Sequence, residues 1–252
     1  MSKVLLPKAM TSTNFSMSLT VLFFAPARDN SFKSFLLPLL PVAIGITIAV
    51  LLILYRRKQA RQRTQVMKAA AAQLGWTFSA EAPWNYLPGL DRFTLFNQGH
   101  NKEIRNMMYG QASGIKTAVF DYMYITGSGR SAARHYQTVV YLEPANLALP
   151  YFSLRPEGLM TKVLAAFGYQ DIDFGQRPEF SRQYILRGQD EPAIRPTFND
   201  GVLSFYESYP GTCTDAGGNQ LFLFRGGYEF QPQEIQSYVG LALQLTNLLR
   251  PY

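Results

Sequence analysis

The sequence is poor in the residues that build disulfides, redox pairs and zinc sites. It contains one cysteine, Cys213, and two histidines, His100 and His135, among 252 residues. A single cysteine excludes an internal disulfide and a CxxC pair, which agrees with a reducing compartment. The two histidines form no HExxH motif, so a zinc site would depend on carboxylates that the fold brings together. We therefore expect no metal and no cofactor, and we expect Cys213 to pack in the core.

Charge is absent from one long stretch near the N-terminus. Residues 35–55 (FLLPLLPVAIGITIAVLLILY) contain no charged side chain. At about 1.5 Å per residue, a helix of this length covers roughly 30 Å, the thickness of the hydrocarbon core of a bilayer. A buried core helix is the alternative, but such helices are usually shorter and carry a charged or amide side chain. The stretch predicts a single transmembrane helix over residues 35–55.

Acidic residues are absent from the segment that follows this stretch. Six basic residues and no acidic residue lie between positions 56 and 68. Basic residues collect on the cytoplasmic side of a span, so the C-terminal part of the chain is expected in the cytoplasm, on a single-pass protein of the cell membrane. The same cations are expected to contact anionic lipid headgroups. The residues assigned to this topology signal and lipid contact are Arg56, Arg57, Lys58, Arg61 and Arg63.

The net charge of +7 does not indicate nucleic-acid binding once the charges are located. Residues 69–252 hold 14 basic and 16 acidic residues, so the large C-terminal part is slightly acidic. Nucleic-acid binding would require a basic patch there. The partners we expect are the lipid bilayer and another membrane or cytoplasmic protein, with no nucleic acid.

The first 34 residues are expected to be a disordered tail. Lys3, Lys8 and the short apolar stretch 17–25 resemble the first parts of a signal peptide. Cleavage there would leave only a few residues before the span, which makes a signal peptide a poor interpretation. A start codon assigned too far upstream is the other alternative.

The rest of the chain predicts one α+β domain. Residues 56–74 are rich in good helix formers and precede Gly75, so the transmembrane helix is expected to continue as a basic juxtamembrane helix. A cytoplasmic domain with a mixed, largely antiparallel sheet and packed helices is expected over residues 75–252. The order of its elements divides it into two similar halves, about 75–170 and 171–252, without a repeat at the level of residues.

Residue patterns locate the elements of this domain. Strands rich in β-branched and aromatic residues are predicted at 116–126 and 135–143, joined as a hairpin through a turn near residues 127–130. Asp171 and Asp173 are expected on one face of an edge strand. Further short strands are expected at 184–186 and 221–224, the second after a turn across 215–219. Helices are expected at 156–167, from Asp190 onward, and at 232–249.

No residue pattern matches a catalytic motif, and no catalytic residue is assigned. Asp121 stands out because it interrupts an apolar strand, where a carboxylate is costly to bury. Pairing with an arginine, capping a bulge and lining a cleft are the open interpretations. The tip around Arg130 resembles a nucleophile elbow or an anion site, but a strand follows it, and a solvated hairpin end is the simpler interpretation. The weak cleft candidates are Asp121, Arg130 and Arg155.

Three stretches carry a resemblance to a known family. They are residues 119–124 (VFDYMY), 137–140 (QTVV) and 152–157 (FSLRPE), all downstream of one span. In these stretches the chain resembles an uncharacterised family of bacterial single-pass membrane-anchored proteins, a domain of unknown function, over roughly residues 70–250. The resemblance implies a bacterial source and the same topology. It implies no activity and no site residue.

Two functions stay open. The first is a non-catalytic interaction or sensing module at the cytoplasmic face of the membrane, which predicts exposed aromatic side chains without a deep polar cleft. The second is a membrane-tethered enzyme acting on a small or lipid-derived substrate, with Asp121 and either Arg130 or Arg155 in one pocket. Because no catalytic signature is present, the sequence favours the first.

Overall fold

The computed structural model describes residues 39–82, 87–159 and 171–250, and the chain divides into two compact units, Met1–Leu54 and Tyr55–Tyr252. The second unit is an α+β domain on one eight-stranded sheet, whose neighbouring strands are all antiparallel. This confirms the predicted fold class. The strands are β1 (Thr77–Glu81), β2 (His100–Ala112), β3 (Ile115–Thr126), β4 (Ala133–Glu143), β5 (Leu149–Pro156), β6 (Tyr184–Gly188), β7 (Thr212–Gly218) and β8 (Gln220–Arg225).

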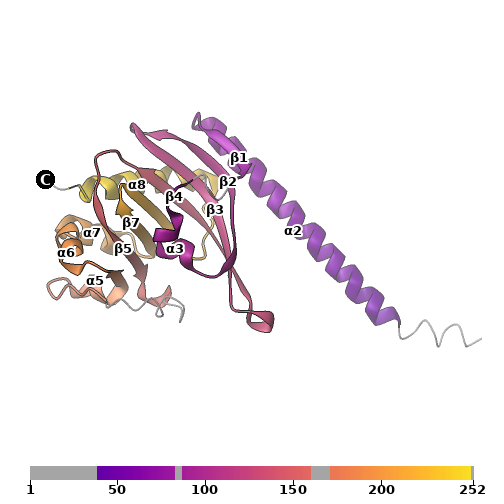
Figure 1. The fold of residues 1–252 in the computed structure, drawn as a ribbon. Coiled ribbons are helices and arrows are strands. Elements are labelled where there is room, and N and C mark those ends of the chain that lie inside the picture. Colours follow the sequence, from indigo (N-terminus) through magenta and orange to yellow (C-terminus); the bar gives the residue numbers. More distant parts are fainter. Residues whose placement is uncertain (1–38, 83–86, 160–170, 251–252) are drawn as a thin grey trace, which may run out of the picture. The chain divides into compact units, whose positions relative to one another are not determined.

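Helices and short 3-10 turns connect and cover these strands (Figure 1). The α-helices are α2 (Leu40–Gln73), α3 (Thr94–Asn97), α5 (Pro178–Gln183), α6 (Glu191–Thr197), α7 (Asp200–Ser208) and α8 (Ile235–Leu248). The 3-10 turns are η3 (Leu90–Arg92), η4 (Gly129–Ser131), η5 (Glu157–Leu159) and η6 (Pro232–Glu234). The predicted tail at 1–34 and most of the helix predicted at 156–167 lie outside the described residues.

The helix α2 joins the apolar run and the basic juxtamembrane sequence in one unbroken element. Within the described part of the chain, it is the one helix long and apolar enough to cross a membrane. Gly75, two residues after its last residue Gln73, has a φ of 68°. The N–H of Trp76 donates to the carbonyl of Ala71 at 2.8 Å, and the N–H of Gly75 donates to that of Ala72 at 3.2 Å. This is a Schellman end, as glycine at this position predicts.

Each face of the sheet has its own core. On one face, which we call the helical face, buried side chains of β3, β4, β5 and β8 pack with α5, α6, α7, α8 and the end of α2. On the other, which we call the aromatic face, Phe93 and Phe96 from the α3 region pack on aromatic residues of β3 and β8. Figure 1 shows α8 and α3 on opposite sides of the strands. The sheet is therefore the middle layer of three.

The strand order shows how the two parts of the chain combine. It reads β1-β2-β3-β4-β8-β7-β5-β6, so the hairpin of β7 and β8 lies between β4 and β5. The two halves predicted from the order of elements, about 75–170 and 171–252, therefore both contribute strands to a single sheet. The predicted hairpin of β3 and β4 is present, and its register places Asp121 opposite Thr138.

Residues 171–174 differ from their prediction as an edge strand. They contain no strand, although the N–H of Ile172 donates to the carbonyl of Leu186 at 2.8 Å. The next bond in the ladder is replaced by a side chain, because Oδ1 of Asp171 accepts from the N–H of Leu186 at 2.9 Å. The carboxylate thus caps the edge of β6 instead of extending the sheet.

Candidate functional site

Asp121 lies at the centre of a buried polar network between α2 and the sheet. Its carboxylate accepts two hydrogen bonds from Arg63, at 3.0 Å from Nε to Oδ2 and 2.8 Å from Nη2 to Oδ1. Thr138 donates to Oδ1 at 2.7 Å, and Asn106 donates to Oδ2 at 2.9 Å. Each carboxylate oxygen therefore has two donors. We call these four residues, Arg63, Asn106, Asp121 and Thr138, the polar junction.

The pairing of β3 with β4 and a bulge in β2 place these groups next to one another. Asp121 and Thr138 are direct partners across β3 and β4, so their side chains share a face. Asn106 lies in a register shift of β2 and has a φ of 50°, a conformation that asparagine tolerates better than most residues. The bulge turns its amide toward Asp121. Thr64 then donates to Oδ1 of Asn106 at 2.8 Å, which adds a second contact from α2.

The electrostatics of the polar junction favour a charged pair. Only 17% of the Arg63 side chain and 9% of the Asp121 side chain are exposed. Burial alone would lower the pKa of Arg63, but the hydrogen bond and charge of Asp121 outweigh it and raise that pKa. Burial and the charge of Asp121 also raise the pKa of the nearby Glu229, and Arg63 opposes this shift.

Arg63 has to be taken out of the group of residues assigned to lipid contact. Its guanidinium faces Asp121, and its Nη1 donates to the carbonyl of Phe230 at 2.5 Å. The other members of the group remain exposed on α2. They are Arg56, Arg57, Lys58 and Arg61. The physical reason is helical spacing, because Arg63 stands one turn before the buried Met67 and so lies on the face of α2 that packs on the domain.

A second buried ion pair lies on the aromatic face. Nη1 of Arg155 is 2.5 Å from Oδ1 of Asp215, and the N–H of Leu95 donates to Oδ2 of Asp215 at 2.6 Å. The guanidinium of Arg155 also lies 4.7 Å from the ring centroid of Phe224. Burial would lower the pKa of Arg155, but the charge of Asp215 outweighs it and raises that pKa. The pair thus links β5, β7 and the α3 region.

The structure does not bring the three cleft candidates together. Asp121 lies on the helical face with Arg63, whereas Arg155 follows the buried Leu154 of that face and therefore lies on the aromatic face. Arg130 is exposed in η4, at the tip of the β3–β4 hairpin. Asp121 is thus paired with an arginine, which was one of the open interpretations, and the partner is Arg63.

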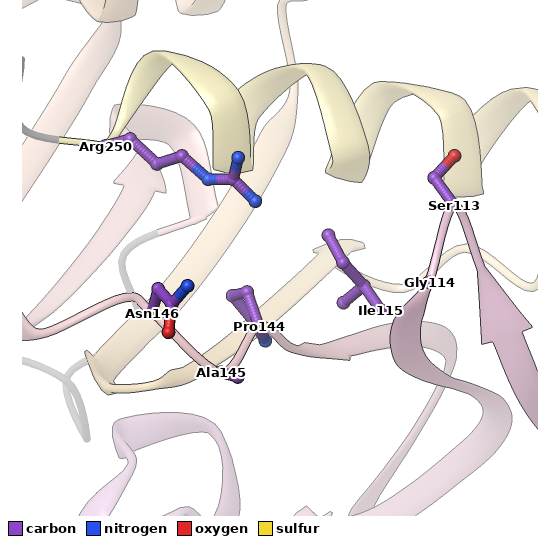
Figure 2. Close-up of a pocket in the computed structure, with 7 residues that line it drawn as sticks. All are labelled: Ser113, Gly114, Ile115, Pro144, Ala145, Asn146 and Arg250. Carbon is purple, nitrogen blue, oxygen red and sulfur yellow. The ribbon is translucent and has the colours of Figure 1, made fainter.

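An open pocket lies at the opposite end of β3 and β4 from this tip (Figure 2). It has a volume of about 350 Å³. Figure 2 shows the side chain of Arg250 extending over the pocket from the end of α8. Arg250 is the one titratable side chain among the described residues of its lining. The lining residues are Ser113, Gly114, Ile115, Pro144, Ala145, Asn146 and Arg250.

Cys213 and the acidic residues form no reactive or metal-binding cluster in the parts that the structure describes. Cys213 is fully buried on the aromatic face, and burial raises the pKa of its thiol to about 11. A thiol in this state is a poor nucleophile. Over residues 39–82, 87–159 and 171–250, no three His, Cys, Asp or Glu side chains are close enough to hold a metal ion.

Comparison with known proteins gives a likeness of fold. No protein-family model matches the sequence, and no curated protein matches it. Among solved structures, the chain is similar to the crystal structure of the mycobacterial trehalose monomycolate transport factor A, TtfA, with a TM-score of 0.52 and 15% sequence identity. The match covers 74% of this chain and 94% of TtfA. At this identity the likeness shows the fold alone.

Proposed function

We propose that this protein is a single-pass membrane protein whose cytoplasmic domain acts without catalysis, by binding a partner protein in the same membrane. The apolar part of α2 is long enough to serve as the anchor. The resemblance to bacterial membrane-anchored proteins supports a bacterial source. The fold of TtfA, which is named as a transport factor, supports a role in assisting transport rather than in catalysis.

The observation that carries this proposal is the way the chain enters the domain. Arg63 bonds to Asp121, and Met67, Ala70 and Ala71 are buried against the sheet. A domain on a flexible linker would need none of these contacts. A domain built onto its entering helix suits a protein that presents a binding surface to a neighbour in the membrane.

The positions of the charged groups support a non-catalytic role. General acid–base catalysis needs titratable groups that reach a substrate, usually in a cleft. Asp121 and Asp215 are both held in buried ion pairs. Among the described residues that line the pocket, Arg250 is the one titratable side chain, and none is a carboxylate or an imidazole.

The cytoplasmic position of the domain is tested with reporter fusions. Alkaline phosphatase fused after the last residue is expected to be inactive, and a fluorescent protein fused there is expected to be fluorescent, because positive residues follow the span. The matched control reverses the charges of Arg56, Arg57 and Lys58, which is expected to raise the phosphatase activity. An active phosphatase on the unaltered chain would overturn the cytoplasmic placement.

The binding role is tested by crosslinking in intact membranes, followed by recovery of the tagged full chain. We expect one defined membrane protein to be recovered with the full chain. The control is residues 1–68 with the same tag, which keeps the anchor and lacks the sheet. Recovery of the same protein with both would assign the contact to the anchor and contradict a binding role for the domain.

A further inference from the structure

The tip of the β3–β4 hairpin is a basic and ordered projection. Arg130 and Arg134 are exposed, and neither forms an ion pair with any described residue. The stem is fixed almost to its end, because His135 stacks on Tyr124 at 4.7 Å and lies 2.7 Å from Oγ1 of Thr126. No acidic residue occurs between Asp121 and Glu143. The tip therefore presents positive charge without compensation from its own strands.

The tip extends past the neighbouring strands. β8 pairs with β4 only from Val139 to Leu142, and β2 begins opposite Ile125. Toward the tip, the N–H of Thr138 still donates to the carbonyl of Tyr228 at 3.0 Å, and beyond Ile125 the strands β3 and β4 pair only with each other. Figure 1 shows the hairpin projecting from the sheet. On the face that carries Arg134 and Tyr136 the projection does not cover the core, since both side chains are exposed.

The direction of the hairpin follows from contacts within the unit Tyr55–Tyr252. Arg63 of α2 contacts Asp121 and Thr138. Thr77, just after the end of α2, pairs with Tyr109, which pairs with Ala118 of β3. Along β3, the direction from Asp121 to Ala118 is therefore the direction in which α2 runs from Arg63 to its C-terminal end. The direction from Asp121 to the hairpin tip is the reverse, from Arg63 toward Tyr55.

The lengths place the tip level with the start of the basic segment. From Arg63 to Tyr55 the helix covers roughly 12 Å at 1.5 Å per residue. From Thr138 to Arg134 the strand covers roughly 13 Å at 3.3 Å per residue. Arg134 and Tyr136 alternate with Thr138, so they lie on the face of the hairpin that meets α2. Arg130 lies further out, at the turn.

The level of Tyr55 is where the apolar run ends and three successive cations begin. Such cations mark the headgroup region of a bilayer. We propose that the hairpin tip is a second membrane contact, in which Arg130 and Arg134 bind anionic headgroups of the membrane that α2 enters. This rests on the proposed function, because it takes α2 as the membrane anchor. Tyr136, 43% exposed, adds an aromatic side chain of the kind that collects at membrane interfaces.

The contact is tested with a fluorophore on the full chain in vesicles. The probe is attached to an introduced cysteine, Ala132→Cys, beside the tip. The matched control is Ala145→Cys, an exposed alanine beyond the other end of β4. Cys213 stays unlabelled because it is fully buried. A lipid that carries a quencher at its headgroup reports contact.

We expect strong quenching at Ala132→Cys in vesicles of phosphatidylcholine with phosphatidylglycerol, weak quenching in phosphatidylcholine alone, and weak quenching at Ala145→Cys in both. Adding Arg130→Glu and Arg134→Glu is expected to abolish the quenching in the anionic vesicles, since each cation favours contact roughly fivefold. Arg250→Glu, at the far end of the domain, is expected to leave it unchanged.

Three other results would each overturn a different claim: the tip contact, its preference for anionic headgroups, or the anchor. Equal, weak quenching at both positions, with the chain still floating with the vesicles, would overturn the tip contact and leave the anchor intact. Quenching that persists after charge reversal or in neutral vesicles would overturn the assignment to anionic headgroups. A chain that does not float with the vesicles would overturn the anchor, and the tip contact with it.

Discussion

Asp215→Ala is expected to lower the free energy of unfolding of the domain by about 3–5 kcal/mol, because it leaves the buried charge of Arg155 without its partner. The side chains of Arg155 and Asp215 are only 5% and 0% exposed. The carbonyls of Leu154 and Thr214 accept from Arg155 at 2.9 and 3.2 Å but cannot neutralise its charge. The N–H of Leu95 also loses its acceptor. For a domain of ordinary stability, about 5–15 kcal/mol, this is a large fraction.

The measurement is denaturant unfolding of the full chain in detergent, monitored by circular dichroism. The matched control is Asp173→Ala, an exposed aspartate whose loss is expected to change stability by less than about 0.5 kcal/mol. Arg155→Met combined with Asp215→Leu removes both charges and is expected to recover most of the loss. A loss below about 1 kcal/mol for Asp215→Ala alone would contradict the claim that Arg155 and Asp215 form a buried ion pair shielded from water.

The regular parts of the fold could be predicted from local patterns. The strands of the β3–β4 hairpin are rich in β-branched and aromatic residues, and α8 has helical spacing. Asp190 caps α6 by accepting from the N–H of Ala193 at 3.1 Å. The strand β2 was missed because it is rich in polar residues and its register shift interrupts the alternation. The order of strands depends on contacts between distant segments, which local patterns do not contain.

Asp215 was missed for a related reason. Together with the glycines that follow it, Asp215 has the composition of a turn in the sequence, since Asp and Gly are common turn residues. In the structure β7 continues to Gly218, and Asp215 faces Phe222 across the hairpin. A buried carboxylate there becomes understandable only with Arg155, 60 residues earlier in the sequence.

The polar junction was predicted in part. The sequence marks Asp121 as an acid that needs a partner, but it offers Arg63 as one of several cations in a basic segment. The sequence did contain a signal for its position, because Arg63, Met67, Ala70 and Leu74 recur at helical spacing along one stripe. Small and apolar residues on one stripe of a basic helix indicate a buried face, and Arg63 lies at its start.

Arg63→Ala is expected to lower the stability of the domain by about 3 kcal/mol, because Asp121 keeps only Thr138 and Asn106 as donors and its charge is left uncompensated. The loss should also release the last turns of α2 from the sheet. Trypsin is therefore expected to cleave after Lys68, exposed but helical in the native chain, faster in the variant. Both measurements use the full chain in detergent.

Arg61→Ala is the matched control, since Arg61 lies on the same helix, two residues away, and is exposed. It is expected to change neither stability nor cleavage. Arg63→Met with Asp121→Leu separates charge from packing, since an apolar pair in the same place should restore stability if the site is dry. If Arg63→Ala behaved like Arg61→Ala, the attachment of α2 would depend on its other contacts, chiefly the buried Met67, Ala70 and Ala71, and the bond between Arg63 and Asp121 would be dispensable for stability.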